Sequence, residues 1–315
     1  MNIETMRVYC DVVLHQSFSR GAQVNDVSQS AATQSIHRLE RHLGVQLVDR
    51  SRRPFTLTRE GQICYNGFRG ILESYDSVVT MVKTMNDKDS GFIRVGAIYS
   101  VGLYDMDQVM LSFIKSYPKT KVNLEIMHPD RVYQSVLTTE IDLGVVSFPV
   151  AGSDIDIVPL GEVKLVYVCK PDNELACLES ISLEQLHNTN FIAFAHDLMV
   201  RKEIDRHLRQ RLTTVNIVAE YKNVETIKQA VKVGLGGAIL QPRTVRTEVE
   251  LGTLISIPIT SPEIIQPLGI VHKQGKIFTP TMTDFISLMI EFRWDDAKAT
   301  DDPSVDSPSE NQVTL

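Results

Sequence analysis

The sequence predicts an α+β protein in which a small helical unit with a wing, one long helix and a larger α/β unit follow one another along the chain. Three observations predict this order. Apolar residues recur at helical spacing across residues 3–44, the stretch from Thr58 to about Asn86 lacks proline and repeats its apolar residues in heptads, and short β-branched segments alternate with helical patterns from Phe92 onward. With 315 residues, the chain is long enough for two or three packing units.

The stretch from Ser28 to Gly44 is the most informative part of the N-terminal unit. Its apolar residues fall on one narrow face of a helix: Ala32, Ile36, Leu39 and Leu43. Ser28 lies where an N-cap is expected and Gly44 where a helix ends. The opposite face carries groups that can read base edges and grip phosphates: Ser30, Thr33, Gln34, His37 and Arg41. Taken alone, the stretch could also be an ordinary amphipathic surface helix.

The flanking residues favour DNA binding. A first helix is predicted over residues 3–16, where Met6, Tyr9, Val12 and Val13 recur at helical spacing. Residues 17–22 open a short second helix, which a turn at residues 25–26 joins to the next helix, as in a helix-turn-helix. Downstream, residues 45–50 and 52–58 predict a short strand pair with the form of a wing.

Together these segments resemble the N-terminal winged helix-turn-helix of the LysR-type transcriptional regulators. The matching residues are Ser17-Phe18-Ser19, Ala22, Ser28-Gln29-Ser30-Ala31, Thr33, Ile36, Leu39-Glu40, Leu43-Gly44, Leu47, Arg50, Leu57-Thr58 and Gly61. The resemblance implies that the helix from Ser28 enters the major groove of double-stranded DNA. The expected DNA-binding residues are Ser28, Gln29, Ser30, Thr33, Gln34, His37, Arg38 and Arg41, with Arg52 and Arg53 of the wing on the backbone or in the minor groove.

Charge is distributed unevenly along the chain. The formal net charge is −7, which argues against a protein that coats nucleic acid over its whole surface. Residues 1–60 nevertheless hold eight arginines and no lysine against six acidic residues. Because arginine makes bidentate contacts with phosphate and guanine, this local excess of arginine suits a DNA-binding unit.

The long helix predicted over residues 58–86 carries a heptad seam. Its apolar residues recur with spacings of four and three: Cys64, Phe68, Ile71, Tyr75, Val78, Val82 and Met85. Such a seam predicts a homodimer contact, with Phe68, Ile71, Tyr75, Val78 and Val82 against their symmetry mates, and the resemblance agrees because LysR-type proteins dimerise through a linker helix here. Residues 86–91 break the pattern and form a hinge. Pairing of dimers into a homotetramer is left open.

The rest of the chain predicts an α/β domain. Strands are expected at Phe92–Ile98, Val122–Met127, Leu143–Ser147, Lys164–Val168, Phe191–Ala193, Val215–Ala219, Ala238–Leu240 and Leu268–Val271, with helices at Asp105–Tyr117, Arg131–Thr138, Val200–Leu212, Val224–Val233 and about Thr281–Phe292. This alternation implies parallel sheets. The resemblance implies two lobes like those of type II periplasmic binding proteins. The expected domains are 1–58 for DNA binding, 59–90 for the linker and hinge, and 91–294 for effector binding, with lobe 1 at 91–160 and 267–294 and lobe 2 at 161–266.

An effector pocket is expected between these lobes, because ligands of open α/β sheets settle at the carboxyl ends of strands. The first strand of the domain ends at Ser100, where a hydroxyl and backbone amides suit a small carboxylate or another oxyanion. Lobe 1 is expected to contribute Tyr99, Ser100, Val101, Ser147 and Phe148, and lobe 2 Phe194, Ala195 and His196. The alternative for Ser100 is that it only caps its helix.

Other classes of protein find less support. No G-x-S-x-G elbow, H-E-x-x-H pair, Walker loop or metal-spaced Cys/His set occurs, so we expect no enzyme, cofactor or metal. The glycines at 234–237 follow a helix and precede a strand, the reverse of a dinucleotide loop. One alternative is a solute-binding protein without a transcriptional role. Another is an oxidant-sensing regulator using Cys169 and Cys177, although the four cysteines suit a reduced, cytosolic chain.

The ends of the chain carry two further expectations. No signal peptide and no run of ~18 apolar residues is present, so a soluble, cytoplasmic protein without a membrane partner is expected. Residues 295–315 hold six acidic residues and almost no apolar ones, which predicts a disordered tail.

Overall fold

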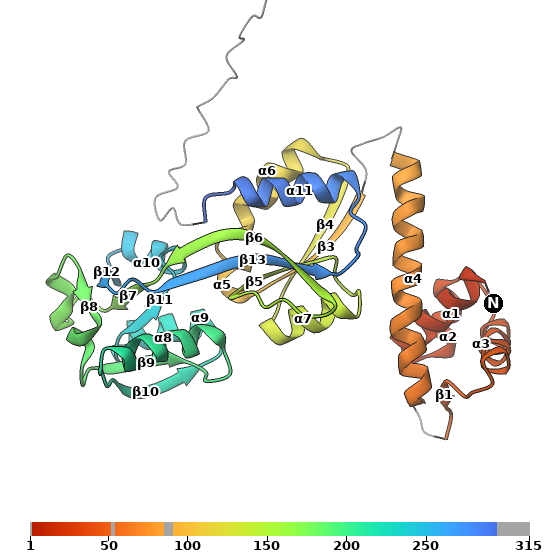
Figure 1. Cartoon of the computed structure of the whole chain (residues 1–315), viewed down its shortest axis with the longest axis horizontal. Helices are drawn as coiled ribbons and strands as arrows, with labels where there is room; N and C mark the ends of the chain where they lie inside the picture. The colour runs from red at the N-terminus through yellow and green to blue at the C-terminus, as the bar shows by residue number, and fades with distance from the viewer. Residues whose placement is uncertain (1, 52–53, 85–90, 295–315) are drawn as a thin grey trace, which may run out of the picture.

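The computed structural model describes residues 2–51, 54–84 and 91–294. In Figure 1 the long helix α4 (Arg59–Thr84) stands between two parts of the molecule, with the small N-terminal helices on one side and two sheet-containing lobes on the other. The predictions for Met85, for the hinge at 86–90 and for the tail at 295–315 lie outside the described residues. The wing arginines Arg52 and Arg53 lie outside them as well.

The N-terminal unit is a helix-turn-helix with a wing. Its elements are α1 (Ile3–Leu14), α2 (Phe18–Val24), α3 (Gln29–Leu43) and the antiparallel pair β1 (Val48–Asp49) and β2 (Thr56–Leu57). The predicted caps of α3 are present: the Ser28 hydroxyl accepts from the amide of Ala31, and Gly44 takes the left-handed conformation at φ 72°. Ile36 and Leu39 of α3 are buried against Tyr9 and Val12 of α1, so the apolar face of α3 points into the core, as predicted.

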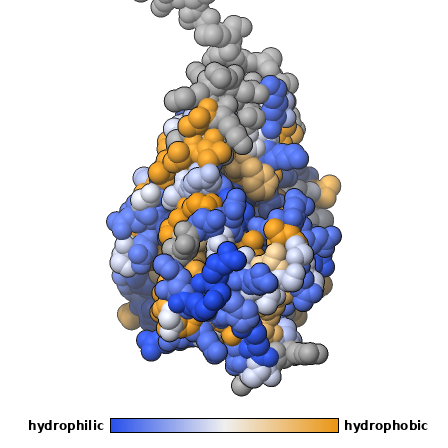
Figure 2. All heavy atoms as spheres, turned by 90° about the vertical axis from the view of Figure 1, so that its right-hand side faces the viewer, coloured by the Kyte–Doolittle hydropathy of each residue, from blue (hydrophilic) through white to orange (hydrophobic). Residues whose placement is uncertain are grey.

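Helix α4 has two apolar faces rather than one. Tyr65, Phe68 and Leu72 are buried in the core of the N-terminal unit, where the ring of Phe68 meets Tyr9 edge-on at a centroid distance of 6.0 Å. The interpretation of Phe68 as a dimer contact is therefore wrong, because this side chain packs within its own chain. The remaining seam residues are about half exposed or more: Ile71, Tyr75, Val78 and Val82. Figure 2 faces the side on which the N-terminal unit lies in Figure 1 and shows apolar side chains among mostly hydrophilic ones.

Lobe 1 is built on a five-stranded sheet in the order β4-β3-β5-β13-β6. Its strands are β3 (Gly91–Ala97), β4 (Thr120–Ile126), β5 (Leu143–Ser147), β6 (Ile155–Lys164) and β13 (Ile265–Lys273). Its helices are α5 (Tyr99–Gly102), α6 (Met106–Ser116), α7 (Pro129–Leu137) and α11 (Pro280–Glu291). Figure 1 shows α6 and α11 on one face of the sheet and α7 on the other. Buried aliphatic and aromatic residues of the sheet and of its covering helices form the core of this lobe.

Lobe 2 contains a four-stranded sheet, β11-β7-β12-β8, and a parallel pair, β10-β9. Its strands are β7 (Val166–Cys169), β8 (Ile181–Ser182), β9 (Asn190–Phe194), β10 (Asn216–Tyr221), β11 (Ala238–Leu240) and β12 (Ile255–Ser261). The α-helices are α8 (Met199–Gln210), α9 (Val224–Lys232) and α10 (Arg246–Glu250), and the 3-10 helices are η1 (Glu174–Cys177), η2 (Leu183–Leu186) and η3 (Pro242–Val245). Each predicted strand and helix overlaps one of the observed elements.

Three strands were not predicted: β6, β8 and β12. Pro159 and Gly161 interrupt the β6 pattern, yet the strand pairs along its length with β13 and accommodates both residues at a register shift. Because β13 runs antiparallel to β5 and β6, and β7 antiparallel to β11 and β12, the sheets are mixed and the expectation of parallel sheets is only partly correct. Strand β6 also carries the sheet of lobe 1 past residue 160, to Lys164.

Candidate nucleic-acid interface and effector cavity

The exposed face of α3 presents the expected polar residues together. Gln29, Ser30, Gln34, His37, Arg38 and Arg41 are exposed, and the last four line one hollow of the surface. In the described part of the chain Arg38 and Arg41 form no ion pair, so their guanidinium groups are available to a polyanion. Ser28 and Thr33 are used within the helix: Ser28 caps it, and the Thr33 hydroxyl donates to the carbonyl oxygen of Gln29 at 2.9 Å.

Glu40 connects this face to the wing, a role that the sequence analysis missed. Its carboxylate is buried and accepts hydrogen bonds from the amides of Leu47 at 3.0 Å and Val48 at 3.3 Å. Arg50 donates to the other carboxylate oxygen at 3.2 Å, and Nδ1 of His37 lies 3.3 Å from the same oxygen. The only signal of this role in the sequence is that Glu40 lies beside Ile36 and Leu39, on the helix face that is otherwise apolar and predicted to be buried. Glu40 fixes the chain that leads into the wing relative to α3.

A cavity of about 220 Å³ lies between the two lobes. Lobe 1 lines it with Tyr99, Ser100, Ser147 and Phe148, which were all expected there. From lobe 2 the expected Phe194 lines it, together with apolar residues such as Leu198 and Leu240. Phe148 takes a left-handed backbone conformation at φ 49°, directly after β5. Such a conformation is unfavourable for an aromatic residue, and it places this ring in the wall of the cavity.

Three expected residues lie elsewhere, and one alternative is wrong. Val101 is fully buried in the core of lobe 1, and Ala195 is buried directly after β9. His196 is exposed and does not line the cavity, whereas the next residue, Asp197, does. Ser100 does not cap its helix, because Ile98 is the N-cap residue of α5 and makes no side-chain cap. Within the described residues the Ser100 hydroxyl has no hydrogen-bond partner, so it is available to a bound molecule.

The cavity also contains buried amide and hydroxyl groups that the sequence analysis did not identify. Gln241 and Gln266 are each about 5% exposed or less, and Nε2 of Gln241 has no hydrogen-bond partner among the described residues. The Tyr133 hydroxyl accepts from the amide of Val150 at 2.8 Å. Burial raises the pKa of Tyr133, so its proton remains available for donation at neutral pH. These groups come from elements far apart in sequence, and only folding brings them together.

Charged groups meet at the rim, where the two lobes face each other. Lys222 and Asp197 of lobe 2 form an ion pair at 3.2 Å, and this hydrogen bond lowers the pKa of Asp197. Nε2 of His128, from lobe 1, lies 3.9 Å from the same carboxylate. Asp130 adds a second exposed carboxylate at the lobe 1 side. Among the described residues that line the cavity, Lys222 is the only lysine or arginine, and its charge is paired with that of Asp197.

The cysteines do not favour the oxidant-sensing alternative. Cys169 is fully buried in β7, and this burial raises its pKa to about 11. Cys177 is exposed in η1. A thiol with a raised pKa is a poor nucleophile at neutral pH, whereas an oxidant sensor needs a thiolate.

The described residues contain no group of three or more His, Cys, Asp or Glu side chains that could hold a metal ion. None of their helices combines the length and the apolar character that a membrane span requires.

Two family models match the chain. The model described as "Bacterial regulatory helix-turn-helix protein, lysR family" matches residues 3–62, and the "LysR substrate binding domain" matches residues 86–293. The HTH-type transcriptional regulator YbhD of Escherichia coli (strain K12) is 26% identical over 294 residues, which cover 93% of this chain and 92% of the relative. A probable RuBisCO transcriptional regulator of Cyanidioschyzon merolae is 28% identical and covers 84% of this chain and 90% of its own.

Solved structures share the fold. A full-length OxyR variant from Pseudomonas aeruginosa superposes with a TM-score of 0.76 at 19% identity, covering 92% of this chain and 93% of its own. Full-length CbnR in complex with its target DNA superposes with a TM-score of 0.65 at 17% identity, covering 92% and 99%.

Proposed function

Because the chain belongs to the LysR-type family of transcriptional regulators, we propose that its recognition helix α3 binds the major groove of operator DNA under the control of a small molecule held between the lobes. The DNA-binding part of this proposal is supported by Arg38 and Arg41, which are exposed, have no ion-pair partner among the described residues and line one hollow together with Gln34 and His37. Arginine and glutamine side chains at the surface of a groove-binding helix discriminate between bases by bidentate hydrogen bonds.

The chemistry of the cavity points to an effector with hydrogen-bond acceptors and an apolar body. The unpartnered Nε2 of Gln241 carries this proposal, because a buried donor without a partner costs free energy until a ligand supplies an acceptor. The hydroxyls of Ser100 and Tyr133 can donate from the opposite lobe, and Phe148 and Phe194 can pack on apolar atoms. We propose a small organic carboxylate, whose oxygens would accept from these neutral donors rather than from a buried cation.

The active form is proposed to be a homodimer that pairs through the exposed face of α4, defined by Ile71, Tyr75, Val78 and Val82. Four large apolar residues on one exposed helix face predict an association surface. Two copies of α3 in a dimer would contact two half-sites of one operator. Because this function requires access to the DNA, we also propose a cytoplasmic location.

The test is footprinting on the DNA upstream of the protein's own gene, with and without a panel of small aliphatic and aromatic carboxylates. We expect one of them to change the footprint of the wild type. In Gln241→Leu the effector affinity should fall about ten- to hundredfold while DNA is still bound, since a hydrogen bond to a charged group contributes about 1.5–3 kcal/mol.

The matched control is Ser112→Ala on the exposed surface of α6, which should respond as the wild type does, whereas Ser100→Ala should respond weakly. An unchanged effector response in both Ser100→Ala and Gln241→Leu would contradict the assignment of the cavity. Two outcomes would contradict the role of α3: the protein binds no DNA, or it binds DNA with an affinity that does not fall as the salt concentration rises.

A further inference from the structure

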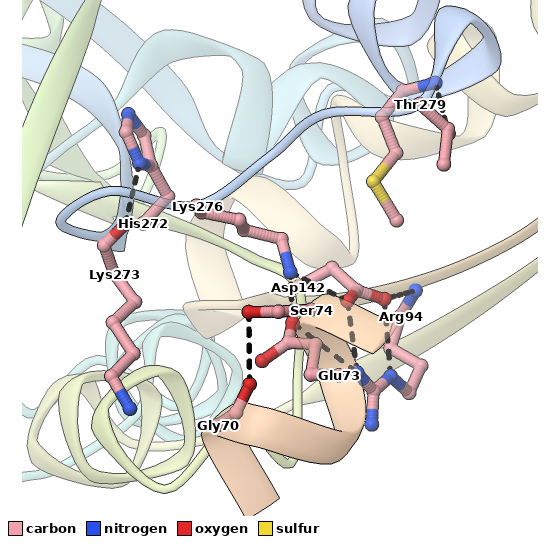
Figure 3. A network of polar contacts seen from close by, with 10 residues as sticks. Gly70, Glu73, Ser74, Arg94, Asp142, His272, Lys273, Lys276 and Thr279 are labelled. Atoms are coloured by element: carbon pink, nitrogen blue, oxygen red, sulfur yellow. Dashed lines mark hydrogen bonds and ion pairs between the residues drawn. The ribbon is translucent and has the colours of Figure 1, made fainter. Parts of the chain in front are cut away.

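A cluster of four charged side chains joins the linker helix to lobe 1. Glu73 of α4 contacts Nζ of Lys276, which follows β13, and lies 3.8 Å from the guanidinium group of Arg94 in β3. Nζ of Lys276 is also 3.0 Å from Asp142, directly before β5. Figure 3 shows the four side chains converging from α4 and the sheet of lobe 1. Three of them belong to lobe 1, and Glu73 alone comes from the linker helix.

The cluster is built for a carboxylate from α4. The side chains of Lys276 and Asp142 are each 4% exposed, and that of Glu73 is 17% exposed. Asp142 accepts three hydrogen bonds from Arg94, and although burial opposes ionisation, these bonds and Lys276 lower its pKa. Lobe 1 thus presents two cations against one carboxylate, and Glu73 provides the second negative charge. Burying Lys276 without it would leave an unbalanced charge.

The same strands that carry the cluster end at the effector cavity. Arg94 lies in β3, and the chain that leaves this strand reaches Ser100. Asp142 precedes β5, whose last residue, Ser147, lines the cavity. Strand β13 runs the other way, from Gln266 in the cavity to Lys273, three residues before Lys276. The strands are neighbours in one sheet, in the order β3-β5-β13, so the cavity and the cluster occupy opposite ends of a single packed unit.

We infer that the cluster of Glu73, Arg94, Asp142 and Lys276 is the docking site through which lobe 1 holds the linker helix, and that the strands β3, β5 and β13 connect it to the effector. The second part rests on the proposed function of the cavity. A packed sheet transmits small displacements instead of absorbing them, so a shift at the cavity ends of the strands alters the contacts that Glu73 makes at the other end. Effector binding would thereby change how lobe 1 positions α4, which carries the DNA-binding unit.

Hydrogen exchange of the full-length protein tests the docking. Glu73→Gln removes the charge and keeps the shape, and we expect exchange to accelerate at least severalfold in residues 273–279 and in α4 around residue 73. The matched control is Asp76→Asn on the same helix, since Asp76 forms its ion pair with Arg7 of the N-terminal unit at 2.6 Å and acts on Arg94 of lobe 1 only through a weaker coulombic interaction. Equal exchange in both variants would overturn the docking site.

Lys276→Met should accelerate exchange at least as much, because it removes the contact with Asp142 as well as the contact with Glu73. Adding Glu73→Gln to Lys276→Met should change little further, because both changes remove the same contact between residues 73 and 276. Lys276→Arg should retain the protection. Fully additive effects would show that the two residues act independently and would overturn the proposal.

The connection to the cavity is tested by adding the carboxylate that changes the wild-type footprint. In the wild type, adding this carboxylate should alter hydrogen exchange at residues 273–279. The Glu73→Gln variant should still bind the DNA and the carboxylate, but the carboxylate should no longer change its footprint. If Glu73→Gln keeps a full footprint response, the inference is wrong while the proposed function stands. If no carboxylate of the panel alters any footprint, the proposed effector class fails, and the exchange comparison decides the docking by itself.

Discussion

At the scale of single residues, Glu40 shows how one buried acid organises a DNA-binding surface. Its carboxylate holds the amides of Leu47 and Val48 and the guanidinium of Arg50 while its own helix presents the reading face. Arg41, the next residue, is exposed and has no ion-pair partner within the described chain. Of these adjacent residues of α3, Glu40 therefore serves the fold and Arg41 is left for the proposed contact with DNA.

This division gives a crossed prediction. Glu40→Ala leaves two buried amides without an acceptor and should lower the free energy of unfolding by about 2 kcal/mol or more, measured by urea unfolding. Arg41→Ala, the matched control, should leave stability within about 0.5 kcal/mol of the wild type. It should weaken binding to all DNA sequences and reduce the salt slope by about 0.9. An unstable Arg41→Ala with normal DNA binding would reverse this assignment.

At the scale of elements, α4 contacts two parts of its own chain and leaves a further apolar face exposed. Tyr65 and Leu72 pack into the N-terminal core, Glu73 faces lobe 1, and Val78 and Val82 are exposed. The N-terminal core covers one apolar face of α4, and no described residue buries the other. The uncovered face is the expected dimer contact.

Charging this face should separate the dimer without unfolding the chain. Val78 is 49% exposed, so Val78→Asp costs little in the single chain but places an unpaired charge in the seam. We expect dimer dissociation to become at least about a hundredfold easier, which corresponds to about 2.8 kcal/mol. Sedimentation at micromolar concentration measures it. Gln62→Asp, on the opposite side of α4, should remain dimeric. A dimeric Val78→Asp would remove the linker helix from the interface.

At the scale of the whole molecule, buried polar contacts hold the lobes together across the cleft. Lys228 of α9 is 4% exposed and donates to the hydroxyl of Tyr104, in lobe 1, at 2.7 Å. Lys228 also pairs with Glu248 at 3.1 Å, and the more exposed Lys232 pairs with the same carboxylate at the same distance. The lobes are thus linked by a contact between residues that do not line the cavity and that needs no effector.

Removing this link should destabilise the effector domain. Lys228→Met removes the hydrogen bond to Tyr104 and one of the two cations that pair with Glu248. Because Lys232 still pairs with this carboxylate, we expect a loss of about 1.5–3 kcal/mol, as for a hydrogen bond to a charged group. Lys232→Met removes a half-exposed partner of the same carboxylate and should cost less than about 1 kcal/mol. Urea unfolding of both variants makes the comparison. Equal urea midpoints for the two variants would show that Lys228 contributes no more to stability than Lys232 does.

The sequence by itself determined most of the elements and their order. Helix α3 follows from the spacing of Ile36 and Leu39 and from caps at Ser28 and Gly44, all of which act within a few residues. Local patterns likewise predicted β5 and β11 with their observed bounds. They failed for β6, where Pro159 and Gly161 obscure a strand that exists because β13 pairs with it from more than a hundred residues away.

Only the tertiary structure decided which residues share a site. It brought Gln241 and Tyr133 into one cavity with Ser100, and it removed Val101 and His196 from it. It also turned Phe68 inward and gathered Glu73, Asp142 and Lys276 into one cluster. Periodicity reports which side of an element is apolar, but the partner that covers that side depends on contacts between segments distant in sequence. Burial and charge pairing fix those contacts when the chain folds.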